Sequence, residues 1–183
     1  MAKGRSEGSS RPTKRPASRR KWWTTGLTVA TLAAVIVGYF AYRAVADLPG
    51  VKLEDQGNVH IQLVTEPHVA YNSEPPTSGP HLPYIAPWGI HDVPIARELQ
   101  VHNLEDGGVM VQYYCAAPCP DLVAKLAEIV RRYDAQVILA PFPGMRTRIA
   151  LTAWTRLDAF DDFDEARIVR FIRAYRGIDH HKG

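Results

Sequence analysis

The sequence predicts a small domain of the α/β or α+β class, preceded by one N-terminal transmembrane helix. Two observations lead to this fold class. A segment without a charged residue covers residues 22–42, and short apolar runs then follow in the order strand, long loop, strand, helix, strand, strand, helix. This order is typical of two helices packed on a mainly antiparallel sheet, with a long Pro-rich loop. The residues that follow the apolar segment, in a chain of 183, are enough for one compact domain.

Residues 22–42 have the properties of a single-pass membrane anchor. At about 1.5 Å per residue, a helix of this length spans the roughly 30 Å hydrocarbon core of a bilayer. Aromatic residues of the kind found at membrane interfaces lie near its ends: Trp22, Trp23, Tyr39, Phe40 and Tyr42. The Lys/Arg excess in the tail 1–21, which we expect to be disordered, predicts a cytoplasmic N-terminus. We therefore expect a cell-membrane protein with the lipid bilayer as a partner, an extracytoplasmic C-terminal domain and no nucleic-acid partner.

A cleaved signal peptide is the alternative, because Ala44-Val45-Ala46 before Asp47 resembles a cleavage site. We favour an uncleaved anchor, since the apolar run exceeds the usual apolar region of about 7 to 15 residues and Arg43 lies within the recognition segment. The expected domain organisation is then a spacer at 43–58, the extracytoplasmic domain at 59–177 and a polar tail at 178–183.

The first half of the predicted domain is mostly irregular. Residues 59–64 alternate apolar and polar side chains, as a half-buried strand does. Residues 65–100 contain seven prolines, which exclude long helices and central strands. A strand is predicted at 109–114, entered through the turn Asp106-Gly107-Gly108. The intervening loop is unusually long for a compact domain, and such loops are often functional.

The second half of the domain has clearer periodicity. Residues 121–133 are predicted to form a helix with one apolar stripe, and Pro120 suits its first position. Strands follow at 136–140 and 148–154, separated by a turn-prone Pro/Gly segment. The acidic segment 158–164 supplies capping residues for a last helix, which ends at Gly177. The apolar positions of that helix are Ile168, Phe171, Ile172 and Tyr175.

Cys115 and Cys119 are the only cysteines in the sequence. Outside the cytoplasm a pair four residues apart is expected to form a disulfide. A metal or redox site is an alternative, because Cys119 lies where the N-cap of a helix should be and a helix N-terminus lowers the pKa of a thiol. A pair of free, unreactive thiols is the third interpretation. The order strand, Cys-x-x-x-Cys-Pro, helix also resembles the metal loop of Sco-type copper chaperones, over a short stretch of chain.

Five of the seven histidines lie within the segment 60–102. Imidazole is the most common metal ligand among side chains, and the surrounding prolines would fix the loop backbone. Bracing of the loop through hydrogen bonds to carbonyls is the alternative role. His180 and His181 are expected in the disordered terminal tail, with an accessory metal contact as the other interpretation.

Several segments resemble a mostly bacterial, membrane-anchored family, the domain of unknown function 3105 (DUF3105). The most specific are Pro75-Pro76-Thr77-Ser78-Gly79-Pro80-His81 and Val101-His102-Asn103-Leu104-Glu105-Asp106-Gly107-Gly108. The resemblance implies no assigned activity, and it places the functional weight on His68, His81 and His102. The family commonly shows His where this chain has Asp106, which favours Zn²⁺ or a harder ion over a soft copper site.

The sequence therefore predicts an extracytoplasmic domain that binds copper or zinc. The predicted ligands are His68, His81, His102 and Asp106, with Cys115 and Cys119 as a second site or a disulfide. A non-catalytic interaction module, with a protein partner outside the cytoplasm, is one alternative and a thiol oxidoreductase is another. An enzymatic role is not favoured, since no nucleophile elbow surrounds Ser78 and no nucleotide-binding fingerprint occurs.

Overall fold

A computed structural model describes residues 19–46 and 48–181, and divides the chain into two units, 1–47 and 48–183. The first unit contains helix α1, Arg19–Ala46. Many of its apolar side chains are exposed: Leu27, Val29, Leu32, Val35, Ile36, Val37, Tyr39, Phe40 and Tyr42. Within the described part of the chain, no helix combines the length and the apolar character that crossing a membrane requires. Residues 22–42, which the sequence predicts as a membrane span, lie within α1. Most of the predicted basic tail lies outside the described residues.

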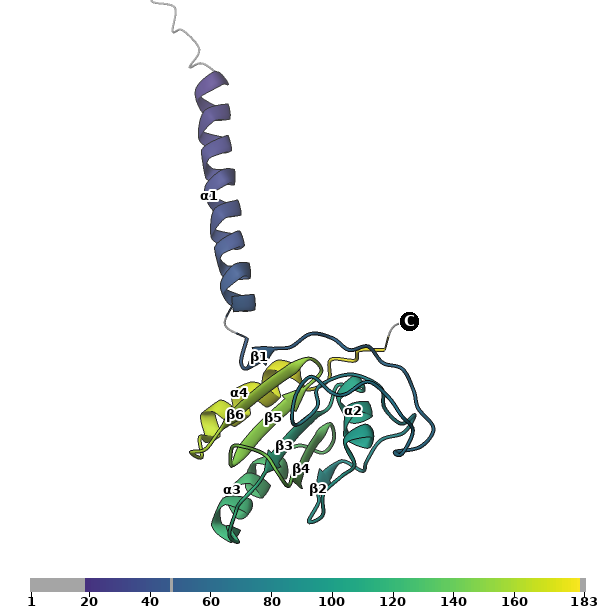
Figure 1. Cartoon of the computed structure of the whole chain (residues 1–183). Coiled ribbons are helices and arrows are strands. Elements are labelled where there is room, and N and C mark those ends of the chain that lie inside the picture. The colour runs from purple at the N-terminus through teal and green to yellow at the C-terminus, as the bar shows by residue number, and fades with distance from the viewer. Residues whose placement is uncertain (1–18, 47, 182–183) are drawn as a thin grey trace, which may run out of the picture. The chain divides into compact units, whose positions relative to one another are not determined.

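The second unit is built on a six-stranded mixed sheet with the order β1-β6-β5-β3-β4-β2 (Figure 1). The strands are β1 (Val51–Lys52), β2 (Gly89–Ile90), β3 (Val109–Tyr113), β4 (Val137–Pro141), β5 (Ile149–Ala153) and β6 (Arg156–Phe160). β3, β4 and β2 are parallel to one another, and the pairs β3–β5, β5–β6 and β1–β6 are antiparallel. The sheet is mixed rather than mainly antiparallel because helix α3, Pro120–Val130, carries the chain back between β3 and β4, as a parallel pair requires.

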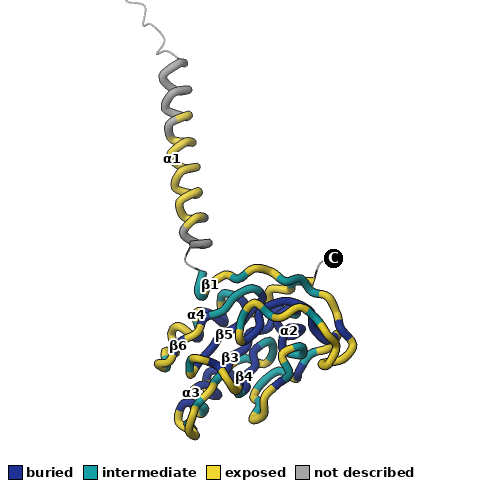
Figure 2. The backbone as a smooth tube through the Cα atoms, in the orientation of Figure 1, coloured by how far each residue is buried: buried dark blue, intermediate teal, exposed yellow. Residues whose placement is uncertain are grey.

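Helices cover both faces of this sheet. α3 and α4, Glu165–Tyr175, pack on the face that presents Val109 and Val111 of β3. α2, Arg97–Glu105, packs on the opposite face with Met110. Alternate residues of β3 thus enter different cores, as the period of a strand dictates. Figure 2 shows the central strands buried between these layers.

Most predicted elements of the second half are confirmed with small shifts in their ends. The predicted strands at 109–114, 136–140 and 148–154 correspond to β3, β4 and β5. The predicted helices correspond to α3, with Pro120 in its first turn, and to α4. Gly177 follows α4 with a φ of 86°, a left-handed conformation that glycine adopts without strain.

Other predictions were wrong. The expected strand at 59–64 is absent, and its only pairing is an isolated bridge between His60 and His81. α2 was not predicted, because most of its residues are polar and it contains only three large apolar side chains. β6 occupies residues 156–160, so Asp158 belongs to a strand, whereas Asp164 of the same acidic segment caps α4 as predicted. The fold therefore has three helices on the sheet where the sequence predicted two.

Both ends of the second unit take part in the fold. β1 lies in the segment predicted as a spacer, and it pairs with β6. After α4, the chain lies against the end of α2: the Gly177 amide donates to the Gly107 carbonyl at 2.8 Å, and the His180 amide donates to the Glu105 carbonyl at 2.9 Å. The described part of the segment predicted as a disordered tail, residues 178–181, is thereby held beside α2.

Candidate metal centre

Three imidazoles and one carboxylate converge on the α2 side of the sheet. His60, His81, His102 and Glu105, which we call the histidine cluster, each offer one ligand atom within 4.8 Å of the others. The three ring centroids lie 4.9 Å (His60–His81), 5.2 Å (His60–His102) and 5.1 Å (His81–His102) apart. The rings therefore surround a common point.

Two pieces of local structure create this convergence. His60 and His81 are brought together by backbone pairing, in which the Ile61 amide donates to the His81 carbonyl at 2.8 Å and the His81 amide donates to the Val59 carbonyl at 3.0 Å. His102 and Glu105 lie three residues apart on α2, a spacing that places both side chains on one helix face. The irregular segment and the helix thus supply two ligands each.

The Glu105 carboxylate lies at the centre of the cluster and is fully buried. Its Oε1 accepts a hydrogen bond from Asn58 Nδ2 at 2.6 Å. Its Oε2 lies 2.9 Å from His81 Nε2, 3.7 Å from His60 Nε2 and 4.0 Å from His102 Nδ1. Burial raises the pKa of Glu105, but the hydrogen bonds from Asn58 and His81 outweigh it, and the pKa lies below its ordinary value. Glu105 is therefore a buried carboxylate with one oxygen directed at three imidazoles.

His81 is held by hydrogen bonds at both ring nitrogens and is fully buried. Nδ1 donates to the Gly79 carbonyl at 2.7 Å, and Nε2 lies 2.9 Å from Glu105. Both ring nitrogens face oxygen atoms, so these two contacts fix the orientation of the ring. Metal-bound histidines are typically oriented by this kind of hydrogen bond to a carbonyl.

His102 offers a ligand atom that has no other partner. Among the described side chains, its Nδ1 is one of the few buried polar atoms without a hydrogen bond. Burial lowers the pKa of His102, although the negative charge of Asp106 opposes the shift. The ring is therefore favoured in its neutral form, whose lone pair can bind a metal.

A second group adjoins the first and shares His102. His102, Asp106 and His181 also place one ligand atom each within 4.8 Å of the others. His181 Nε2 lies 3.7 Å from Asp106 Oδ1, and His102 Nε2 lies 3.9 Å from the same oxygen. A hydrogen bond between Asp179 and His181 Nδ1 raises the pKa of His181. We call this second set the tail group.

The structure brings together only part of the predicted ligand set. His81 and His102 belong to the histidine cluster, and Asp106 belongs to the tail group. His68 is in neither: its Nδ1 lies 2.8 Å from the Val69 carbonyl and its Nε2 lies 3.6 Å from Glu98. His60 was noted in the sequence but not chosen as a ligand. Glu105 was missed, because its spacing from His102 is informative only once a helix is known there.

Cys115 and Cys119 form a disulfide, which confirms the first interpretation of the pair. Cys119 also occupies the predicted N-cap position of α3. The disulfide lies just beyond the C-terminal end of β3. The histidine cluster lies at the other end of this strand, beside the turn that precedes it. At about 3.3 Å per residue, β3 separates the two features by roughly 20 Å. The bonded sulfurs offer no thiolate, and the histidine cluster does not include them.

Replacing both cysteines with serine is expected to lower the free energy of unfolding by about 2 kcal/mol, the loop-closure value for so short a loop. Urea denaturation of the variant and of the wild type, without reductant, measures this difference. Metal binding should be unchanged, because the disulfide lies at the other end of β3. A variant that folds but loses metal would place the sulfurs in the metal site.

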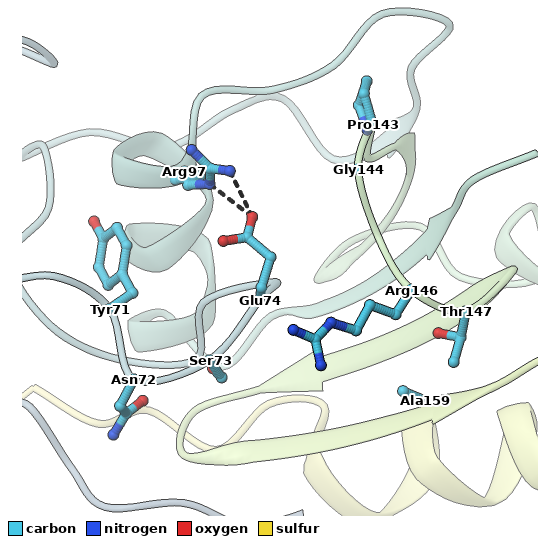
Figure 3. Close-up of a pocket in the computed structure, with 10 residues that line it drawn as sticks. All are labelled: Tyr71, Asn72, Ser73, Glu74, Arg97, Pro143, Gly144, Arg146, Thr147 and Ala159. Carbon is cyan, nitrogen blue, oxygen red and sulfur yellow. Dashed lines mark hydrogen bonds and ion pairs between the residues drawn. The ribbon is translucent and has the colours of Figure 1, made fainter. Parts of the chain in front are cut away.

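A cavity with a volume of about 820 Å³ has a different character. Its lining includes an ion pair in which Arg97 Nε and Nη2 donate to Glu74 Oε1 at 2.9 and 2.6 Å (Figure 3). Arg146 enters from the segment that precedes β5 (Figure 3). No member of the histidine cluster or of the tail group lines this cavity. This cavity is therefore separate from both groups.

The comparison with protein-family models agrees with the sequence resemblance. Curated proteins and solved structures give no match. A family model described as a protein of unknown function, DUF3105, matches residues 62–182. This range contains α2, α3, α4 and five of the six strands. It includes every member of both groups except His60. Since the match covers more than half of the sequence, the chain belongs to the DUF3105 family.

Proposed function

We propose that this domain binds a divalent transition metal through His60, His81, His102 and Glu105. The observation that carries the proposal is the convergence of three imidazoles on one oxygen of a buried carboxylate. In a tetrahedral zinc site with bonds of about 2.0–2.1 Å, ligand atoms lie about 3.4 Å apart. The distances of 2.9, 3.7 and 4.0 Å to Glu105 Oε2 fall on both sides of that value. Side-chain rotations that bring these distances toward about 3.4 Å would complete the coordination.

The ligand set favours Zn²⁺ or Cu²⁺. Three neutral imidazoles and one carboxylate form a nitrogen-rich site of intermediate softness, and the bonded cysteines supply no soft thiolate for Cu⁺. Access is from one side, because the His60 side chain is 41% exposed whereas those of His81 and Glu105 are fully buried. An ion can therefore enter past His60 and reach ligands that are already held in place.

A buried ion pair between His81 and Glu105 is the competing interpretation. It accounts for their 2.9 Å contact but leaves two features without a role. His60 lies 3.7 Å from the carboxylate, beyond hydrogen-bonding distance, and His102 Nδ1 is buried without a partner. A metal ion engages all three rings at once, which is why we favour it.

Metal analysis of the purified full-length chain tests the proposal. Wild-type protein loaded with Zn²⁺ or Cu²⁺ and dialysed should retain metal, and His60→Ala and His102→Ala should each lose most of it. His68→Ala and His91→Ala are matched controls outside both groups and should behave as wild type. Equal retention in all five proteins would refute the proposal. Lower melting temperatures without a change in metal content would instead support an interaction module with bracing histidines.

Location outside the cytoplasm is part of the same proposal. It is supported by the Cys115–Cys119 disulfide, since such bonds persist in oxidising compartments, and by the basic segment that precedes residues 22–42 in the sequence. Fractionation of cells that express the chain, followed by protease treatment of intact cells, tests membrane association and sidedness. Recovery of the chain in the soluble cytoplasmic fraction would contradict the proposed location.

A further inference from the structure

We infer that the tail group is a second metal position, and that the imidazole of His102 is shared between it and the histidine cluster. The inference rests on the proposed function, since it extends the same site. His102 precedes Glu105 by three residues and Asp106 by four, so its ring lies beside both carboxylates on α2. Its Nδ1 faces Glu105 at 4.0 Å and its Nε2 faces Asp106 at 3.9 Å. The two nitrogens of one ring thus point into different ligand groups.

His181 is oriented to serve the second position. Its Nδ1 lies 2.7 Å from Asp179 Oδ1, and its Nε2 lies 3.7 Å from Asp106 Oδ1 and 3.5 Å from Glu105 Oε2. A carboxylate at one ring nitrogen fixes the imidazole and leaves the other nitrogen for a metal, a pattern common in metal sites. His181 is also accessible, with a side chain that is 45% exposed.

The tail is placed by contacts that do not involve a metal. Besides its backbone hydrogen bonds to Gly107 and Glu105, the His180 ring stacks on Trp154 with centroids 5.8 Å apart. Gly107 has a φ of +76°, and a Cβ there would lie 2.8 Å from the Ile178 amide nitrogen. The tail can approach α2 this closely only because residue 107 is a glycine. These contacts bring His181, far from α2 in the sequence, to Asp106.

Sharing the ring requires His102 to bind as imidazolate. Binding of the second cation displaces the proton from Nε2 to solvent, and each nitrogen then donates a lone pair to one ion. The imidazolate and the carboxylates of Glu105 and Asp106 supply three negative charges against two divalent cations. No oxidation or reduction accompanies the step. Cu²⁺ is the appropriate probe, because two Cu²⁺ ions joined by an imidazolate couple magnetically.

Titration of the full-length chain with Cu²⁺, followed by electron paramagnetic resonance, tests the inference. Wild type should bind two equivalents, with the second bringing the signal well below the sum for two independent ions. His181→Ala should bind one equivalent with an uncoupled signal. Asp106→Asn should behave like His181→Ala and serves as the second variant if His181→Ala does not fold. His68→Ala is the matched control, because His68 belongs to neither group and its ring contacts Val69 and Glu98 instead.

The outcomes separate this inference from the proposed function. One equivalent in wild type and in His181→Ala alike would overturn the second position and leave the histidine cluster intact. Two equivalents with additive signals would overturn the shared ring. Failure of the wild type to bind copper or zinc would overturn both proposals.

Discussion

Replacing Glu105 with glutamine is expected to raise the dissociation constant for Zn²⁺ by more than about 100-fold. Loss of an outer-shell partner alone typically costs about 10- to 100-fold, and Glu105 is a direct ligand in the proposed site. Glutamine keeps the volume of the side chain and can still accept the hydrogen bond from Asn58. It removes the negative charge at the oxygen that faces His60, His81 and His102. A competition titration against a chelating dye measures the change.

Two further variants test whether the loss of affinity is specific to the Glu105 carboxylate. Asn58→Ala removes only the partner of Glu105 Oε1, so its affinity should fall between those of wild type and Glu105→Gln. Glu98→Gln is the matched control, because Glu98 lies beside His68, outside both ligand groups. Wild-type affinity in Glu105→Gln would remove the carboxylate from the coordination sphere.

The second large effect is expected for Gly108→Ala, which should lower the free energy of unfolding by about 3 kcal/mol or more. The new Cβ would lie 2.4 Å from the carbonyl oxygen of Asn103 and 2.7 Å from the Trp88 ring. The first neighbour is backbone at the end of α2, so no side-chain rotation relieves the clash. For a domain of this size the loss is equivalent to a decrease in Tm of about 10 °C. Urea denaturation and thermal melting both measure it.

Gly144→Ala is the matched control for this prediction. Gly144 has a φ of +90°, and a Cβ there would have no neighbour within 4 Å. Its cost should be limited to the strain of the left-handed conformation, about 1 to 2 kcal/mol. Because Gly108 adjoins the helix that carries His102 and Glu105, Gly108→Ala should also weaken metal binding, whereas Gly144→Ala should not. Equal destabilisation by both substitutions would show that the clash at residue 108 is relieved by movement of α2.

The elements that the sequence predicted correctly are those with a strong apolar pattern. The apolar stripe of α4 is set by Ile168, Phe171 and Ile172, all fully buried, and the sequence shows them at helical spacing. β3 was recognised by its apolar residues and its preceding Gly-Gly turn. α2 lacks such a pattern, because several of its buried residues are polar: Gln100, His102, Asn103 and Glu105. The helix that carries half of the candidate site was therefore the one that periodicity could not detect.

By itself, the sequence determined the family, the disulfide partners, the two regular helices of the domain and the enrichment of imidazoles in one irregular segment. These properties are local, because they depend on residue type and on spacing along the chain. Only the tertiary structure decided which imidazoles share a site. It replaced His68 with His60, added Glu105 and brought His181 to Asp106. Ligands meet through backbone pairing between residues 60 and 81 and through docking of the tail on α2, and such long-range contacts leave no periodic trace in a sequence.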